Sequence, residues 1–175
     1  NSCDLVFVSR YKLNKRPNSS KYYDATLMTS HPRFPVKEEF SEEISCLSNQ
    51  FVEIYNQSAN AESYELDQIA GIGYRKALEF LIKDYLISKV SEPEKIEKIK
   101  KNHLGNCIKE IDNPKLKKVA ERATWLGNDE THYIRKWGEK DIKDLITLIR
   151  ITVGFVEQDI LADKYLDEME EGRKI

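Results

Sequence analysis

Apolar residues recur at two different periods along the chain, and the change of period divides it into two parts. Residues 4–11 (DLVFVSRY) and 22–29 (YYDATLMT) are rich in β-branched and aromatic residues, and the polar segment 14–21 (NKRPNSSK) lies between them. Strands favour the first kind of residue and turns favour the second, so this pattern predicts a β-hairpin. Pro32 and Pro35 then favour an extended link to the rest of the chain.

From residue 38 onward, apolar residues recur at steps of three and four, which places them on one face of a helix. This spacing predicts helices over residues 38–56, 64–88, 93–102, 114–127 and 139–169. The fold class that follows is mainly α, a helical bundle of about five helices with a short N-terminal β-hairpin. We therefore divide the chain into a β-rich segment over residues 1–34 and a helical bundle over residues 35–175.

Two proline-containing sequences mark helix starts in the middle of the chain. Ser91 precedes Pro93 and Glu94 with the spacing of an N-cap, a first-turn proline and a carboxylate that returns a hydrogen bond. Asn113 directly before Pro114 gives a similar signal for the next helix.

The distribution of charge bears on partners more than the net charge of −2 does. Charged residues make up 33% of the 175 residues and glycines and prolines are few, which is typical of folded helices rather than of a disordered chain. Basic residues cluster over residues 10–21 and 95–118, whereas residues 157–171 are acidic. A basic cluster can follow the phosphates of RNA or another nucleic acid, and alone it is more often a solvated helix face.

Three cysteines, Cys3, Cys46 and Cys107, form no close CxxC pair, so the sequence predicts neither a disulfide framework nor a complete metal site. No cofactor is expected either. The cysteine usage indicates a reducing compartment, and the apolar stretches are interrupted by charges, so we expect a cytoplasmic protein without membrane contact. The chain begins with Asn1 rather than Met, which leaves open a missing upstream zinc ribbon whose last ligand would be Cys3.

Candidate functional residues are densest over residues 121–137 (ERATWLGNDETHYIRKW). An imidazole can exchange a proton near neutral pH and a guanidinium can hold a phosphate, so His132 with Arg122 would suit RNA cleavage without a metal. Asn128 would orient the substrate. The alternative is structural: Asn128 and Asp129 cap backbone groups, and His132 forms a hydrogen bond across a helix junction.

A second group lies on the long helix predicted before this segment. Arg75 and Glu79 are four residues apart and share a helix face. In one interpretation this row faces the His132 segment and forms a binding surface with Asp129 and Arg135. In the other it is a surface ion-pair ladder of small energetic value.

Two segments, YRKALEFLIKDYLI at residues 74–87 and RATWLGNDETH at residues 122–132, resemble the two signature helices of an uncharacterised HEPN-like family. The resemblance covers about residues 35–160 and rests on R-K-x-L-E and G-N-D-x-x-H elements in the right order and separation. It implies an all-α bundle, commonly a homodimer, often joined to zinc-ribbon or restriction-nuclease modules. It also implies roles in RNA processing or antiviral defence.

The chain departs at one motif position from the ribonucleases of the wider superfamily, which carry Arg before the polar residue and end with His (R-N-x-x-x-H). Here Gly127 precedes Asn128, although His132 matches. The usual phosphate-holding side chain is therefore absent unless Arg122, Arg75 or Arg135 replaces it. We expect a non-catalytic helical binding or dimerisation module, an accessory domain in nucleic-acid processing or defence. The alternative is a metal-independent ribonuclease of the HEPN type.

Overall fold

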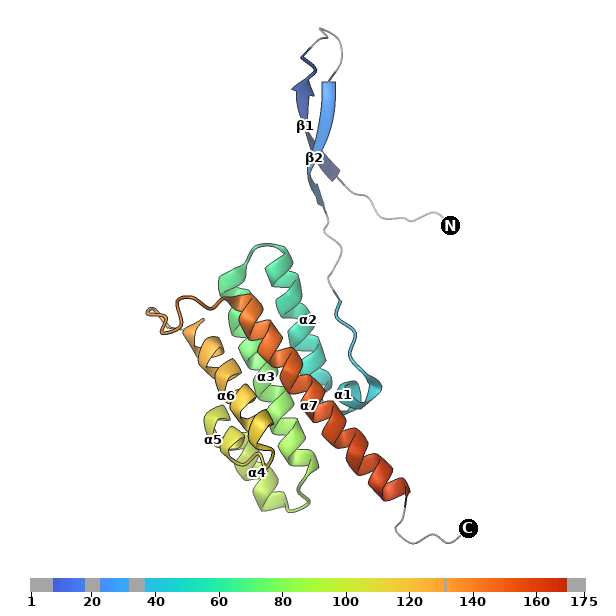
Figure 1. The fold of residues 1–175 in the computed structure, drawn as a ribbon, viewed down its shortest axis with the longest axis vertical. Coiled ribbons are helices and arrows are strands. Elements are labelled where there is room, and N and C mark those ends of the chain that lie inside the picture. Colours follow the sequence, from blue (N-terminus) through green and yellow to red (C-terminus); the bar gives the residue numbers. More distant parts are fainter. Residues whose placement is uncertain (1–7, 18–22, 32–36, 131, 170–175) are drawn as a thin grey trace. The chain divides into compact units, whose positions relative to one another are not determined.

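The structure is a computed structural model that describes residues 8–17, 23–31, 37–130 and 132–169. It divides the chain into two compact units, Asn1–Pro35 and Val36–Ile175 (Figure 1).

The first unit contains an antiparallel pair of strands, β1 (Val8–Lys15) and β2 (Tyr23–His31). Their register places Leu13 opposite Ala25. The hairpin predicted from the β-branched and aromatic residues is thereby confirmed, with a first strand that continues to Lys15. Residues 4–7 of the first predicted strand lie outside the described residues.

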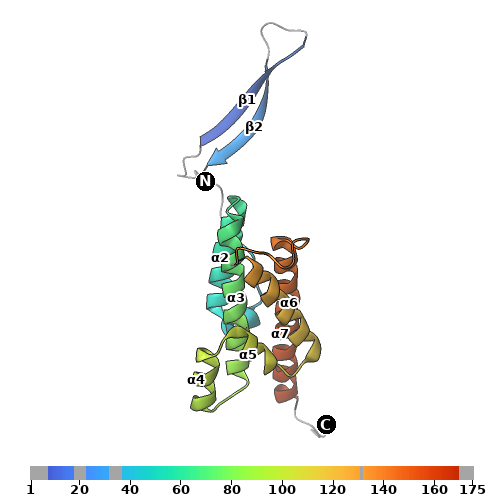
Figure 2. The ribbon, with the colours of Figure 1, turned by 90° about the vertical axis from the view of Figure 1, so that its left-hand side faces the viewer.

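The second unit is a helical bundle, shown from two sides in Figures 1 and 2. In the described part of the chain it has seven helices: α1 (Glu42–Leu47), α2 (Asn49–Ser63), α3 (Asp67–Ser88), α4 (Pro93–Lys101), α5 (Leu104–Lys109), α6 (Pro114–Asp129) and α7 (Ile142–Glu168). Helix α3 is central, because it packs against α2, α6 and α7 along its length and against α4 and α5. The mainly helical fold class is confirmed.

The expected number of about five helices is wrong, and two short helices account for the difference. The helix predicted over residues 38–56 is interrupted at Ser48, which ends α1 and caps the start of α2. The Ser48 hydroxyl accepts a hydrogen bond from the backbone N–H of Phe51 (3.3 Å) and donates one to Asp84. A serine hydroxyl can take the place of a backbone hydrogen-bond partner, so the chain can end one helix and start the next at this residue. The apolar spacing therefore continues from the first helix into the second. Helix α5 has six residues, too few to show a helical period.

The helix starts were predicted with mixed success. Asn113 caps α6 as expected, because its Oδ1 accepts hydrogen bonds from the backbone N–H groups of Lys115 (2.9 Å) and Leu116 (3.1 Å). The cap predicted at Ser91 is wrong: the N-cap of α4 is Glu92, and it makes no side-chain capping bond. The proline that follows sets the backbone for the first turn without such a bond.

The core of the second unit lies where the apolar faces of α2, α3, α6 and α7 meet. Its largest fully buried side chains include Phe51, Tyr55, Tyr74, Leu78, Leu81, Ile82 and Leu145. The apolar stripe predicted on the second long helix is therefore buried. None of the described helices combines the length and apolar composition that crossing a bilayer requires.

Candidate functional site

Three of the predicted site residues meet where α6 crosses α3. Arg75 on α3 donates a hydrogen bond from Nε to Oδ1 of Asn128 on α6 (2.8 Å), although 53 residues separate them in the sequence. Nη1 of Arg75 also lies 3.2 Å from Oε2 of Glu79, one helical turn further along α3. The side chains of this cluster are partly buried, so Arg75 is held between one neutral and one charged partner.

Glu79 extends this polar cluster along α3. Its second oxygen, Oε1, lies 2.7 Å from Nζ of Lys83, which also donates to the backbone carbonyl of Lys100 at the end of α4 (3.1 Å). Burial alone would raise the pKa of the Glu79 carboxyl, but Lys83 and Arg75 together hold that pKa below its usual value. The row is thus a network that links α3 with α4 and α6, rather than an isolated surface ladder.

Gly127 permits the close approach of α6 to α3. A Cβ at this position would lie 2.8 Å from Cβ and 2.7 Å from Cγ of Arg75, closer than side chains tolerate. On α3, a Cβ at Gly71 would likewise lie 2.9 Å from Cβ of Glu130. The space beside Gly127 is therefore filled from the neighbouring helix by the stem of Arg75.

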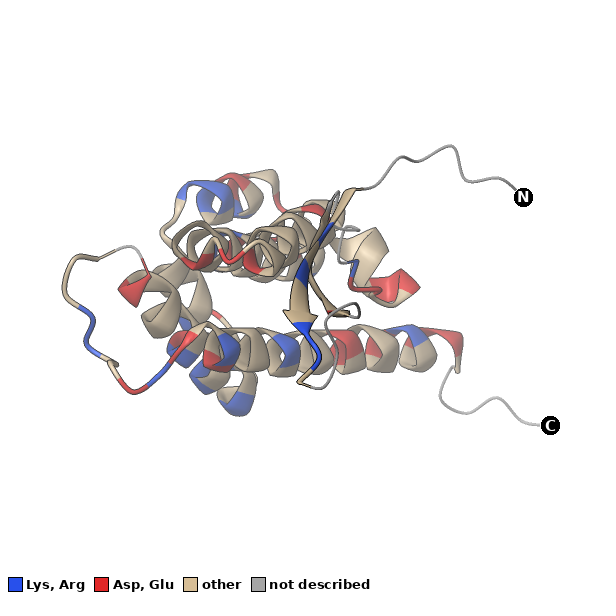
Figure 3. Ribbon diagram, turned by 90° about the horizontal axis from the view of Figure 1, so that it is seen from above, with Lys and Arg blue, Asp and Glu red and all other residues tan. Residues whose placement is uncertain are grey.

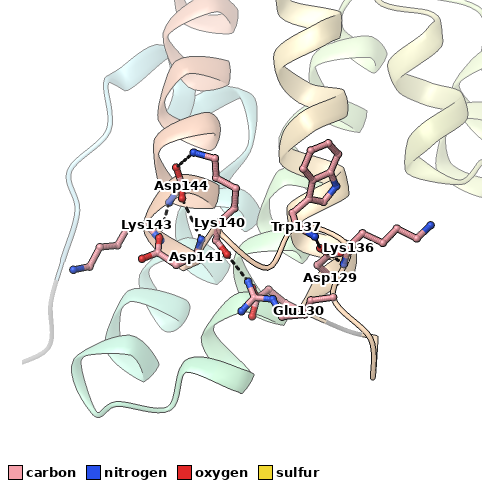
Figure 4. Close-up of polar contacts among 9 residues, drawn as sticks. Asp129, Glu130, Lys136, Trp137, Lys140, Asp141, Lys143 and Asp144 are labelled. Carbon is pink, nitrogen blue, oxygen red and sulfur yellow. Dashed lines mark hydrogen bonds and ion pairs between the residues drawn. The ribbon is translucent and has the colours of Figure 1, made fainter.

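Asp129 organises the loop that follows α6. Its side chain is only 5% exposed, and Oδ2 accepts hydrogen bonds from the backbone N–H groups of Lys136 (2.9 Å) and Trp137 (2.7 Å). Figure 4 shows both bonds at the end of the loop. Asp129 thus satisfies backbone donors, as the structural interpretation of this residue predicts.

Arg135 folds the same loop back towards α7. Its Nη2 lies 2.8 Å from Oε1 of Glu130 and 2.8 Å from the backbone oxygen of Lys140. The Glu130 side chain is only 8% exposed, so this ion pair is partly shielded from water. Helix α7 then begins with a capping box between Asp141 and Asp144. The Arg135 side chain is therefore engaged within the loop and not with the Arg75 cluster.

His132 is exposed on this loop, and no described residue makes a hydrogen bond to its imidazole. The structure shows neither the bond across the junction that a structural role predicts nor a partner that would orient the ring for proton transfer. Arg122 is also exposed, and its Nη1 donates to the backbone oxygen of Lys118 (3.1 Å). Six residues separate Arg122 from Asn128, which is about 120° around the helix axis. The three predicted catalytic residues are not brought together as one group.

An exposed aromatic groove lies between α6 and α7, and sequence reasoning did not assign it. The rings of Trp125 and Trp137 are parallel, with centroids 5.8 Å apart, and the guanidinium carbon of Arg122 lies 5.5 Å from the Trp125 ring centre. Both indoles remain more than 40% exposed. A cavity of about 460 Å³ is lined by Arg122, Trp125, Leu126, Trp137, Lys140, Asp144, Thr147 and Leu148. Exposed tryptophans beside a cavity are typical of a binding surface.

Within the ranges that the structure describes, no three His, Cys, Asp or Glu side chains are placed to hold a metal ion. Cys46 is exposed and Cys107 is buried, and burial raises the pKa of the Cys107 thiol. The zinc-ribbon ligand suggested at Cys3 lies outside the described residues.

Comparisons with known proteins identify no relative of this chain. No family model matches it, and neither a curated protein nor a solved structure matches it. The HEPN-like resemblance stays a prediction.

Proposed function

We propose that the chain is a non-catalytic helical module for binding and dimerisation, an accessory domain in nucleic-acid processing or antiviral defence. The observation that carries this proposal is the engagement of the motif side chains in the fold itself. Asn128 holds Arg75 between α3 and α6, and Asp129 holds two backbone N–H groups of the following loop. In the described part of the chain His132 makes no hydrogen bond or ion pair, so nothing there orients it beside a group that would stabilise charge on a phosphate, which is where such enzymes gain most of their rate.

A nucleic-acid partner is supported by the exposed face of α6. Lys115, Lys118 and Arg122 follow one another at steps of three and four, so they share one face of the helix. In the described residues none of the three forms an ion pair, whereas lysines of α4 pair with neighbouring glutamates. Cations without a carboxylate partner are available to the phosphates of RNA.

The double variant Lys115→Glu, Lys118→Glu is expected to weaken RNA binding and to reduce the slope of log affinity against log salt by about two. Fluorescence anisotropy with single-stranded RNA at several salt concentrations measures both quantities. The matched control reverses Lys95 and Lys100 on α4, which already pair with Glu92 and Glu97. An equal loss of affinity in both double variants would contradict a site on α6.

The substitution His132→Ala is expected to change the free energy of unfolding by less than about 0.5 kcal/mol, because the side chain is exposed and makes no hydrogen bond to a described residue. It is also expected to leave RNA cleavage unchanged at a negligible level. The measurement is incubation of wild type and variant with single-stranded and structured RNA in EDTA, which excludes contaminating metal nucleases.

The alternative function, a metal-independent ribonuclease, is favoured by one observation: the exposed imidazole of His132 is open to a substrate. Cleavage by wild type that is lost in His132→Ala, with an unchanged circular dichroism spectrum, would establish it. The control is Tyr133→Ala, which truncates the next exposed side chain of the same loop. Loss of cleavage in both variants would point to the loop rather than to the imidazole.

A further inference from the structure

Helix α7 carries two apolar faces, and only one of them is buried in the bundle. The inner face, with Leu145, Ile149 and Val156, is fully buried. A second row, called here the outer seam, advances by alternating steps of three and four residues: Leu148, Ile151, Phe155, Gln158, Ala162 and Tyr165. This is the heptad spacing of a helix that packs along another helix.

The outer seam is incompletely covered by its own chain. Ile151 is 42% exposed and Tyr165 59% exposed, and Met169 continues the seam with 71% exposure. Leu148 and Phe155 are only partly buried. Figures 1 and 2 show α7 at the outside of the bundle along its length. A long row of mostly apolar side chains, interrupted by Gln158 and partly open to water, indicates a surface that meets another molecule.

Gly154 gives a second, independent indication at the edge of the outer seam. A glycine inside a helix costs about 1 kcal/mol relative to alanine. Gly71 and Gly127 are explained by neighbouring side chains of the same fold, but a Cβ at Gly154 would meet no atom within 4 Å. Gly105 in α5 is equally open, and what distinguishes Gly154 is its place beside the outer seam, where it leaves room for close approach by a helix from outside the chain.

The charge along α7 selects the kind of helix that fits. The first half of α7 carries two basic residues, Lys143 and Arg150, and one acid, Asp144, whereas the second half carries one lysine, Lys164, and five acids: Glu157, Asp159, Asp163, Asp167 and Glu168. Figure 3 shows the acidic residues gathered towards the C-terminal end. A second α7 lying parallel would place acid beside acid, whereas an antiparallel one places the acidic half beside the basic half. Two antiparallel helix dipoles side by side also attract each other, which favours the same orientation.

We propose that α7 pairs antiparallel with α7 of a second copy of this chain through the outer seam. The heptad steps fix the register that covers the whole seam. Leu148 lies opposite Tyr165 of the second copy, Ile151 opposite Ala162, and Phe155 opposite Gln158. This register sets a large side chain against the small Ala162, and it brings Gly154 beside the facing helix. The inference rests on the proposed dimerisation and adds its surface and orientation.

The same register gives the aromatic groove an occupant. Met169 of the second copy lies opposite Asp144, and Leu166, which is 73% exposed, lies at the same level. Asp144 lines the groove together with Trp125 and Trp137. The apolar end of each α7 therefore reaches the tryptophan pair of the other copy, and the two-fold symmetry repeats this contact.

The first test is the mass of the full chain in solution by light scattering and sedimentation. Wild type is expected to be a dimer, and Ile151→Glu is expected to raise the dissociation constant roughly 30-fold or more, because a charge is then buried in the seam. The control is Ile69→Glu, the same change at an exposed isoleucine of α3, which should leave the dimer intact. Circular dichroism verifies that both variants keep their helices.

The second test fixes orientation and register by oxidation, in a background with Cys3 and Cys46 replaced by serine. The double variant Ile151→Cys, Ala162→Cys is expected to form disulfide-linked dimers, and neither single variant should do so. In the antiparallel register, residue 151 of one copy is offset from residue 151 of the other copy by 11 positions along the seam. This offset is about 16 Å, which is beyond the reach of a disulfide. Cross-linking by Ile151→Cys alone would show parallel pairing and overturn the inference.

The remaining outcomes separate this inference from the proposed function. A wild type that is monomeric at all concentrations would overturn both the dimerisation and its surface. A dimer that withstands Ile151→Glu would overturn the surface and leave the dimerisation standing. RNA cleavage that depends on His132 would overturn the non-catalytic function and leave the outer seam as the dimer surface.

Discussion

The substitution Gly127→Ala is expected to lower the free energy of unfolding by about 1–3 kcal/mol, although alanine is the better helix former by about 1 kcal/mol. The added methyl group would lie 2.8 Å from Cβ and 2.7 Å from Cγ of Arg75. These atoms belong to the inner part of the Arg75 side chain, and they cannot move far without loss of the hydrogen bond to Asn128. Urea unfolding followed by circular dichroism measures the change.

The control is Gly105→Ala in α5, where a Cβ meets no atom within 4 Å. This variant should be as stable as wild type or more stable by up to about 1 kcal/mol. A double-mutant cycle with Arg75→Gly isolates the contact, because this change removes both Cβ and Cγ of residue 75 and the cost of Gly127→Ala in unfolding free energy should then shrink. A Gly127→Ala protein as stable as the Gly105→Ala protein would show that α6 has room for a side chain at residue 127. This result would favour the ribonuclease alternative, because a cation could then be accommodated at this position.

The sequence could predict elements that repeat their own period several times. Helix α3 has 22 residues, so the stripe through Tyr74, Leu78 and Leu81 defines its buried face without knowledge of its neighbours. The break at Ser48 could not be read in the same way, because Ile44 and Phe51 continue one apolar spacing on both sides of it. Such a break depends on a hydroxyl that caps the backbone and finds a partner on another helix.

The candidate site was predicted in its parts but not in its assembly. The spacing of Arg75 and Glu79 placed both on one helix face, and their ion pair is seen. What Arg75 meets on α6 depends on how closely two helices cross, and this distance is set by tertiary packing at Gly127. The tryptophan pair is a similar case, because Trp125 on a helix and Trp137 on a loop meet only after the loop has folded.

The second large effect is expected at the residue that folds this loop. Asp129→Ala should lower the free energy of unfolding by about 2–3 kcal/mol, because two backbone N–H groups lose a charged acceptor that is 5% exposed. One of these donors is the backbone of Trp137, so the stacking on Trp125 should loosen and tryptophan emission should shift towards that of solvated indole.

Asp129→Asn keeps an acceptor oxygen without the charge, so its free energy of unfolding should lie between those of wild type and Asp129→Ala. Asp112→Ala, which removes an exposed carboxylate, serves as the control. If the free energy of unfolding of Asp129→Ala is within about 0.5 kcal/mol of wild type and the emission is unchanged, the loop is held instead by the ion pair between Arg135 and Glu130. Substitution of Arg135 or Glu130 should then lower the free energy of unfolding.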